Sequence, residues 1–159
     1  MNETKPECNA PDEEIQPSPR TVTFPAQFGY LVAVRGFVAQ EAEACGLSPE
    51  SVYAVQLAVD EAFTNIIEHA FGGESQENIE CCCQGNQEGL KIILRDCGHS
   101  FDPERVPWPD LESDLRHRKV GGLGLYLIRK LMDEVQYKYI PPAAGVQGCN
   151  VLIMVKHKE

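Results

Sequence analysis

The fold is decided by residues 49–71, which read PESVYAVQLAVDEAFTNIIEHAF. Apolar side chains recur in this stretch at spacings of three and four, a pattern that places them on one side of a helix. The members of this apolar stripe are Val52, Val55, Val59, Ala62 and Ile66. Ser48 suits the N-cap, Pro49 suits the first helical position, and two glycines follow the stretch. The sequence therefore predicts a helix over residues 49–71 whose apolar face meets a β-sheet.

Shorter periodic segments on both sides of this helix predict the rest of the fold. The expected elements are, in order, a strand at residues 21–24, a helix that carries Leu31, Val34, Phe37 and Val38, the helix at 49–71, strands at 79–83 and 90–95 joined by a turn, a helix that carries Leu123, Leu127 and Leu131, and strands near 135–140 and 150–156. This order predicts an α/β fold of the α+β two-layer sandwich type, in which helices cover one face of a mixed, mainly antiparallel sheet.

The chain is expected to divide into a leader and one domain. Residues 1–19 combine four prolines with acidic and polar side chains, so we expect a disordered leader. Residues 20–159 then form the domain, because 159 residues leave no room for a second one. A polar stretch with several prolines is longer than a simple connector, and it predicts a functional lid at about residues 99–120 or a disordered segment.

Composition excludes several classes of function. The formal charge of -10 repels phosphate backbones and anionic lipids, so direct nucleic-acid binding and membrane association are not expected. No apolar stretch approaches the roughly 20 residues that span a bilayer, and the acidic first residues cannot be a signal peptide, so a cytoplasmic protein is expected. The seven cysteines include no Cys-x-x-Cys pair, which favours structural or bystander thiols over a redox or metal role.

Glu61 and Asn65 are the first candidate functional pair. They are four residues apart and therefore lie one above the other on the predicted helix, more than a quarter-turn from the centre of its apolar stripe. A carboxylate there could deprotonate an attacking hydroxyl, and the amide oxygen could complete an oxygen shell around Mg²⁺. Taken alone, the pair is more typical of an ordinary solvated helix face.

A second candidate is the sequence Leu94-Arg95-Asp96-Cys97-Gly98, in which a predicted strand ends at an acidic residue. The Asp96 carboxylate could accept the amino group of adenine, where guanine would present a carbonyl. Gly98 would let a flat ligand approach the backbone. The alternative is a common turn at the end of a strand.

A third candidate is Gly121-Gly122-Leu123-Gly124-Leu125, at the start of the last predicted helix. Unpaired backbone N–H groups and the helix dipole favour an anion at such a position, so the glycines could bind phosphate. Residues 116–119 precede it as the only dense basic run of an acidic chain, and they could steer a polyphosphate. A plain glycine-rich helix start is the alternative. The sequence of a P-loop is absent.

The three candidates, in this order, resemble the N, G1 and G2 boxes of the GHKL ATPases, the superfamily of gyrase, Hsp90, histidine kinases and MutL. Within this superfamily the chain looks most like the anti-sigma-factor serine kinases of the RsbW and SpoIIAB type. This likeness rests on the sequence pattern Glu-Ala-x-Thr-Asn-x-x-x-His-Ala, which begins at Glu61, and on Phe101-Asp102-Pro103 after the G1 box. The resemblance covers about residues 20–158. It implies the GHKL, or histidine-kinase-type, ATPase fold with ATP and Mg²⁺ as cofactors.

The resemblance also implies a role for each residue of the three boxes. Glu61 would be the general base that activates a serine, and Asn65 would hold Mg²⁺. Asp96 would bind the adenine amino group and Gly98 would let the base approach. Gly122, Gly124 and Leu125 would form the phosphate side of the nucleotide site.

The family function implied is that of an anti-sigma factor with ATP-dependent serine kinase activity. Its partners would be a sigma factor and a STAS-type anti-anti-sigma factor, and homodimer formation stays open. Arg35 is a charge within an apolar helix, so it lies either on an exposed flank or, as the family implies, at the partner interface. The main alternative is an ATP-dependent binding module without chemistry. A histidine-kinase catalytic domain is a weaker alternative, because no phospho-acceptor helix precedes the candidate boxes.

Overall fold

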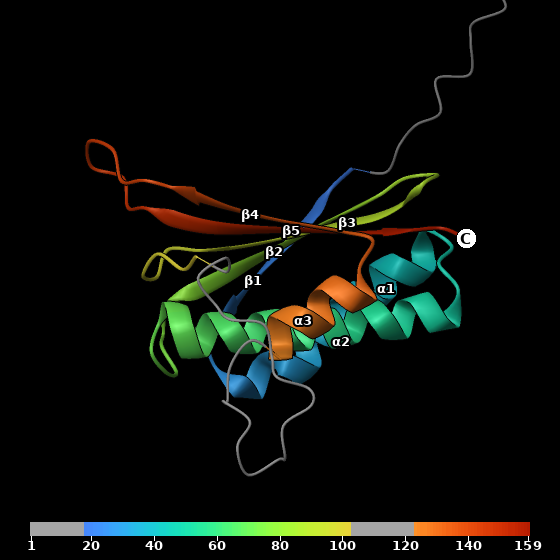
Figure 1. Cartoon of the computed structure of the whole chain (residues 1–159), viewed down its shortest axis with the longest axis horizontal. Helices are drawn as coiled ribbons and strands as arrows, with labels where there is room; N and C mark the ends of the chain where they lie inside the picture. The colour runs from blue at the N-terminus through green and yellow to red at the C-terminus, as the bar shows by residue number, and fades with distance from the viewer. Residues whose placement is uncertain (1–17, 103–122) are drawn as a thin grey trace, which may run out of the picture.

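The five-stranded sheet has the order β1-β2-β3-β5-β4, and every pairing between neighbouring strands is antiparallel. The computed structural model describes residues 18–102 and 123–159, and Figure 1 shows the helices of this part on one side of the sheet. The elements are β1 (Arg20–Pro25), η1 (Phe28–Tyr30), α1 (Leu31–Ala44), α2 (Pro49–Asn65), η2 (Ile66–Ala70), β2 (Asn78–Gly85), β3 (Gly89–Asp96), α3 (Leu123–Leu131), β4 (Glu134–Ile140) and β5 (Cys149–His157). The predicted two-layer fold is therefore confirmed, with no parallel pair among the described strands.

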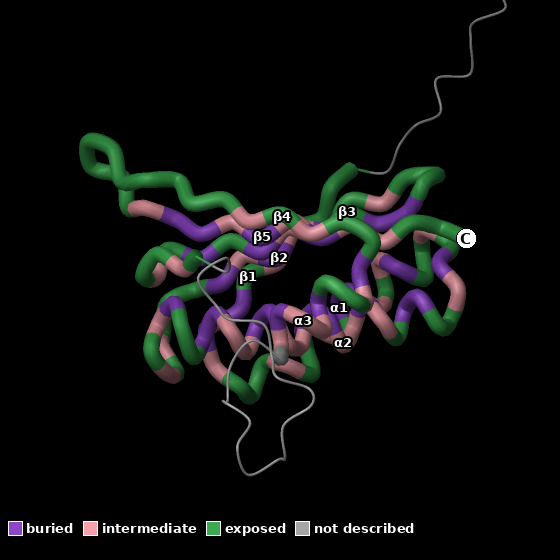
Figure 2. The backbone as a smooth tube through the Cα atoms, in the orientation of Figure 1, coloured by how far each residue is buried: buried purple, intermediate pink, exposed green. Residues whose placement is uncertain are grey.

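The core lies between the helices and the inner face of the sheet, where Figure 2 shows the buried backbone positions gathered. In β2 and β3 buried residues alternate with more exposed ones, as expected for strands covered on one side. The large side chains that become fully buried are Phe63, Ile67, Ile79, Leu90, Ile92, Leu94, Ile128 and Met154. No helix in residues 18–102 or 123–159 is long and apolar enough to cross a membrane.

Helix α2 begins as the sequence predicts. The Ser48 side chain accepts a hydrogen bond of 3.2 Å from the backbone N–H of Ser51, and Pro49 occupies the first turn. The prediction of one regular helix over residues 49–71 is wrong beyond Asn65, because residues 66–70 form the π-helical turn η2. The backbone N–H of Phe71 bonds the carbonyl of Ile66, five residues earlier, at 3.2 Å. Turns of this kind are frequent at functional sites.

The central strands β3 and β5 are neighbours in the sheet but far apart in the chain. Their register places Asp96, the last residue of β3, opposite Asn150 near the start of β5. The chain leaves the sheet after Asp96, returns to it as the edge strand β4, and reaches β5 at Cys149. The predicted leader lies almost wholly outside the described residues, as does the predicted lid beyond residue 102, so both stay predictions.

A disulfide lies directly beyond this last pair of the ladder, because Cys97 follows Asp96 and Cys149 precedes Asn150. Cys97 and Cys149 are bonded, with their Cα atoms 4.2 Å apart. Cys45, Cys81, Cys82 and Cys83 are free. The sequence did not indicate this pairing, because the partners are 52 residues apart and no cysteine motif links them.

Candidate functional site

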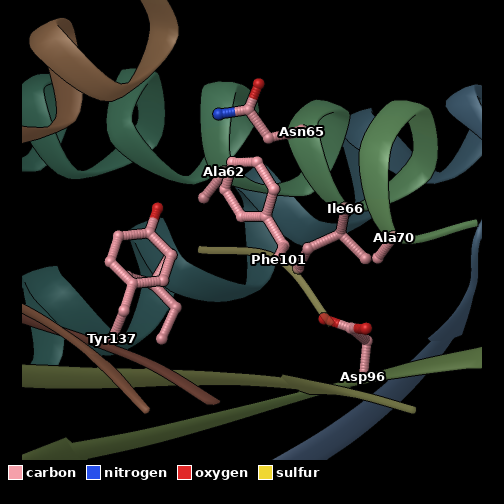
Figure 3. A pocket seen from close by; sticks show the side chains of 8 residues that line it. Ala62, Asn65, Ile66, Ala70, Asp96, Phe101 and Tyr137 are labelled. Carbon is pink, nitrogen blue, oxygen red and sulfur yellow. The ribbon is translucent and has the colours of Figure 1, made fainter. Parts of the chain in front are cut away.

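A pocket opens between the helical layer and the inner face of the sheet (Figure 3). Its volume is about 320 Å³, counting the part that is open to solvent. The residues that line it are Ala62, Asn65, Ile66, Ala70, Asp96, Phe101, Tyr137 and Leu152. The N-box helix and the G1 aspartate, which the sequence singled out separately, therefore face one cavity.

Asp96 lies at the sheet side of this pocket and is 3% exposed. Its Oδ1 accepts two hydrogen bonds, one of 3.0 Å from the backbone N–H of Gly98 and one of 2.9 Å from Asn150 Nδ2. Its Oδ2 receives no hydrogen bond from the described part of the chain. Burial raises the pKa of the Asp96 carboxyl, and the two hydrogen bonds partly counter that shift. One oxygen is thus fixed by the protein and the other is available to a ligand.

Asn150 is a residue of this site that the sequence analysis missed. Its Nδ2 also donates to the carbonyl of His99 at 2.8 Å, and its Oδ1 accepts from the backbone N–H of Phe101 at 3.0 Å. The side chain is 8% exposed and its amide connects β3, β5 and the segment after β3. The signal was available, because a polar residue at an inward position of a predicted strand needs buried partners.

Glu61 and Asn65 lie beside the first turn of α3. A Cβ built on Gly124 would be 2.9 Å from Glu61 Oε2 and 3.3 Å from Asn65 Nδ2. A side chain at position 124 would therefore meet the ends of both side chains, and the Glu61 carboxylate would have to shift. The structure brings together the N-box pair and one G2 glycine, although about 60 residues separate them in the chain.

The Glu61 carboxyl has a raised pKa, which suits a general base. Burial raises its pKa above the usual value, and the negative charges of Asp60 and Glu68 raise it further. A carboxylate with a raised pKa accepts a proton more readily than an ordinary surface glutamate.

Gly98 packs against the π-helical turn η2 and does not face an open space. A Cβ on Gly98 would lie 2.5 Å from the carbonyl oxygen of Ala70, and the neighbouring backbone N–H of His99 donates to that oxygen at 2.7 Å. Glycine at position 98 is thus required for the packing of this segment against η2. The predicted approach of a base to Gly98 stays a prediction.

The remaining predicted site residues lie apart from the pocket or outside the described chain. Leu125 is 5% exposed and belongs to the hydrophobic core. Gly122 and the basic run at 116–119 are outside the described residues. Arg35 does not line the pocket and bonds Asp60 on α2, with Nη1 and Oδ2 3.1 Å apart. Asp60 Oδ1 is buried without a hydrogen-bond partner among the described residues.

Two aromatic residues of the pocket had been given no role from the sequence. The Phe101 ring stacks on His69 at 5.5 Å and meets Tyr137 edge-on at 6.3 Å. Figure 3 shows the Phe101 ring between the helix that carries Asn65 and the strand that carries Asp96. Burial raises the pKa of Tyr137, so its hydroxyl remains a hydrogen-bond donor. These rings give the cavity an apolar wall of the kind on which a flat heteroaromatic base packs.

The chain is similar to known proteins over most of its length. The family described as histidine kinase-like ATPase domain matches residues 24–156. The serine-protein kinase RsbW of Listeria monocytogenes is 34% identical over 123 residues, which cover 75% of this chain and 78% of that protein. The protein of the same name from Staphylococcus epidermidis is 34% identical over 118 residues, which cover 70% of this chain and 74% of that one.

The fold is similar to that of a solved structure. The crystal structure of the RsbU and RsbW domains of a Mycobacterium tuberculosis protein aligns with a TM-score of 0.58 and 14% sequence identity, over 88% of this chain. The chain spans 32% of that larger protein. At this identity the similarity shows the fold alone.

Proposed function

Because the chain belongs to the histidine kinase-like ATPase family and, within it, to the RsbW serine-protein kinases, we propose that it is an anti-sigma factor that phosphorylates an anti-anti-sigma partner. Membership of this family makes it an ATP-dependent protein-serine kinase. The proposal adds the partners and the residues. A sigma factor is released or held according to which partner the protein binds and whether that partner carries phosphate.

One observation carries the assignment of the residues, namely the packing of Gly124 against Glu61 and Asn65. The first turn of α3 is where unpaired N–H groups favour the phosphates of a nucleotide. A carboxylate and an amide beside that turn are therefore beside the reacting phosphate. The nucleotide would extend from there to Asp96, at the other side of the pocket, whose Oδ2 accepts the adenine amino group.

Glu61 would accept the proton of the substrate serine as its hydroxyl oxygen attacks the γ-phosphorus and ADP departs. Its raised pKa supports this role. Asn65 Oδ1 offers Mg²⁺ a hard oxygen ligand, and the described residues contain no cluster of three acidic, histidine or cysteine side chains that could hold a metal ion alone. This donor set fits Mg²⁺, which takes few protein ligands and completes its shell with phosphate oxygens and water. When bound, the ion neutralises charge on the phosphates.

The test of this function is transfer of labelled phosphate. The purified chain with Mg-ATP is expected to phosphorylate one serine of the anti-anti-sigma protein that copurifies with it from its native cell, and to bind a sigma factor when that protein is phosphorylated. Mass spectrometry of the partner identifies the serine. ATP binding without phosphate transfer to any copurifying protein would instead support the binding-module alternative.

Arg35 is proposed to contact both partner proteins. Its side chain is 39% exposed, and its bond to Asp60 ties the first helix to the residue next to Glu61. Arg35→Ala is expected to weaken the partner complex by about 2 kcal/mol or more, roughly 30-fold, as for an interface hot spot. Affinity for Mg-ATP should not change. Titration of labelled partner against the variant measures the effect.

Arg20→Ala is the matched control for Arg35. Arg20 is also an exposed arginine in an ion pair, 2.6 Å from Glu41, and its guanidinium lies over the Phe37 ring. Its loss should cost little stability, since exposed ion pairs contribute at most about 1 kcal/mol, and little partner affinity, because the proposal does not place it at the interface. Equal partner affinity of the Arg35 variant and wild type would remove Arg35 from the interface and leave it a structural partner of Asp60.

A further inference from the structure

The disulfide lies at the adenine side of the candidate nucleotide pocket. Asp96 and Asn150 are opposite each other in the β3–β5 ladder, and their hydrogen bond is 2.9 Å long. Cys97 directly follows Asp96, and Cys149 directly precedes Asn150. The two cysteines are covalently joined. The bond therefore adjoins the two side chains that form the carboxylate end of the pocket.

The hydrogen bonds of Asn150 depend on both sides of this junction. Asn150 follows Cys149, whereas the carbonyl of His99 and the N–H of Phe101 that it bonds follow Cys97. The disulfide keeps these two chain segments together where the ladder ends. Without it, the Asn150 hydrogen bonds that tie the segment after β3 to β5 lie at the edge of a pocket, where water competes for them.

The two cysteines differ in exposure, and a small thiol can reach a disulfide more easily from the side of an exposed cysteine. Cys97 is an exposed residue, whereas Cys149 is 2% exposed. The Arg95 guanidinium lies 3.5 Å from Cys149 Sγ, and a positive charge beside a cysteine sulfur assists thiol–disulfide exchange. The carbonyl of Gln147 lies 3.6 Å from the same sulfur and can accept its S–H once the bond is reduced. Both redox states of Cys149 thus have a polar partner.

We propose that Cys97 and Cys149 form a redox modification site whose co-reactants are low-molecular-weight thiols and disulfides, and that the disulfide state binds ATP more tightly than the dithiol state. This inference rests on the proposed function, because it concerns the same nucleotide pocket. The disulfide holds Asn150, and through it Asp96 Oδ1, in the geometry that leaves Oδ2 available to adenine. Reduction lets the two segments separate and the carboxylate turn.

Reduction of the Cys97–Cys149 bond is an ordinary thiol–disulfide exchange in two steps. The thiolate of a small thiol attacks the sulfur of Cys97, the more exposed cysteine, the electron pair of the S–S bond passes to Cys149 Sγ, and that sulfur takes up a proton. A second small thiol attacks the mixed disulfide on its small-molecule sulfur and releases Cys97, which is protonated in turn. Two small thiols leave as one disulfide, and the protein gains two electrons and two protons. A low-molecular-weight disulfide drives the reverse reaction.

Calorimetry on the full chain tests the coupling. The protein is titrated with Mg-ATP once after oxidation with glutathione disulfide and once after reduction with dithiothreitol, and peptide mapping verifies the Cys97–Cys149 bond. The oxidised protein is expected to bind ATP at least about fivefold more tightly, the lower end of typical coupling between two sites. The double variant Cys97→Ser/Cys149→Ser should bind ATP like reduced wild type under both conditions.

Cys82→Ser is the matched control, because Cys82 is a free cysteine on β2 outside the pocket. This variant should keep the full difference between the two conditions. Equal ATP affinity of oxidised and reduced wild type would overturn the inference alone and leave the proposed function standing. Absence of ATP binding in both states would overturn the proposed function and the inference with it.

A second measurement needs no variant. Because coupling between two sites is reciprocal, saturating ATP must shift the equilibrium of the cysteine pair in a glutathione redox buffer toward the disulfide by the same factor as the affinity ratio. Alkylation of the free thiols and mass spectrometry give the oxidised fraction with and without ATP. An unchanged fraction would also overturn the inference.

Discussion

Replacing Glu61 with glutamine is expected to lower the rate of phosphate transfer by about 10²- to 10⁴-fold, the usual cost of removing a general base. The amide has nearly the same shape as the carboxylate, so the packing beside Gly124 is kept, but it cannot accept the proton of the substrate serine. Affinities for Mg-ATP and for the partner should stay at wild-type values, because the loss falls on the chemical step. Single-turnover transfer of labelled γ-phosphate measures this step directly.

Glu68→Gln is the matched control for Glu61. Glu68 is exposed, and its negative charge raises the pKa of the Glu61 carboxyl. Since a base works only when deprotonated, transfer in wild type should fall as pH drops through this raised pKa, above the usual value near 4.5. Removal of the Glu68 charge should move that fall to lower pH and leave the rate at neutral pH nearly unchanged. Transfer by Glu61→Gln at the wild-type rate would show that another group is the base.

Asp96→Asn is expected to weaken ATP binding by about 10- to 100-fold, the cost of one unpaired polar contact in a buried site. Gly98 N–H and Asn150 Nδ2 both donate to Asp96 Oδ1, so they will hold the new amide with its oxygen toward them. Its NH₂ then faces the adenine amino group, and two donors oppose each other. Calorimetry with Mg-ATP measures the loss.

The triphosphate of purine riboside separates this effect from a general disturbance of the pocket. It lacks the amino group, so wild type and Asp96→Asn should bind it equally. Asp133→Asn is a suitable control variant, because Asp133 accepts a hydrogen bond from His157 N–H outside the pocket and should not influence ATP binding. If Asp96→Asn binds ATP like wild type, adenine does not contact this carboxylate.

The fold could be predicted because its helices and strands follow from patterns of residues that are close together in the chain. The stripe of α2, its Ser48 cap and the alternation of β2 and β3 each depend on residues close in the chain, and each is present in the structure. The π-helical turn could not be predicted in this way. It places the Ala70 carbonyl where His99 N–H reaches it, and that contact depends on how a distant strand ends.

The site was predicted in part for the same reason. Glu61, Asn65 and Asp96 were singled out as candidates because a short motif surrounds each of them. Asn150 and Cys149 are contributed by β5, and their partners lie about 50 residues earlier, so only the sheet order reveals them. Phe101 was quoted as part of a motif, but its stacking on His69 follows from tertiary packing alone. Side chains whose role depends on strand pairing leave little trace in a single sequence.

The place of β5 in the sheet also fixes when the pocket can exist during synthesis of the protein. The ribosome makes β5 after β3 and β4, although β5 separates those two strands in the finished sheet. A nascent chain that stops before residue 149 can form the β2–β3 hairpin and the helices α1 and α2, but β4 has no neighbour to pair with. Such a chain carries Asp96 without the amide that orients it and Cys97 without its bonding partner. Nucleotide binding can therefore begin only after β5 has left the exit tunnel.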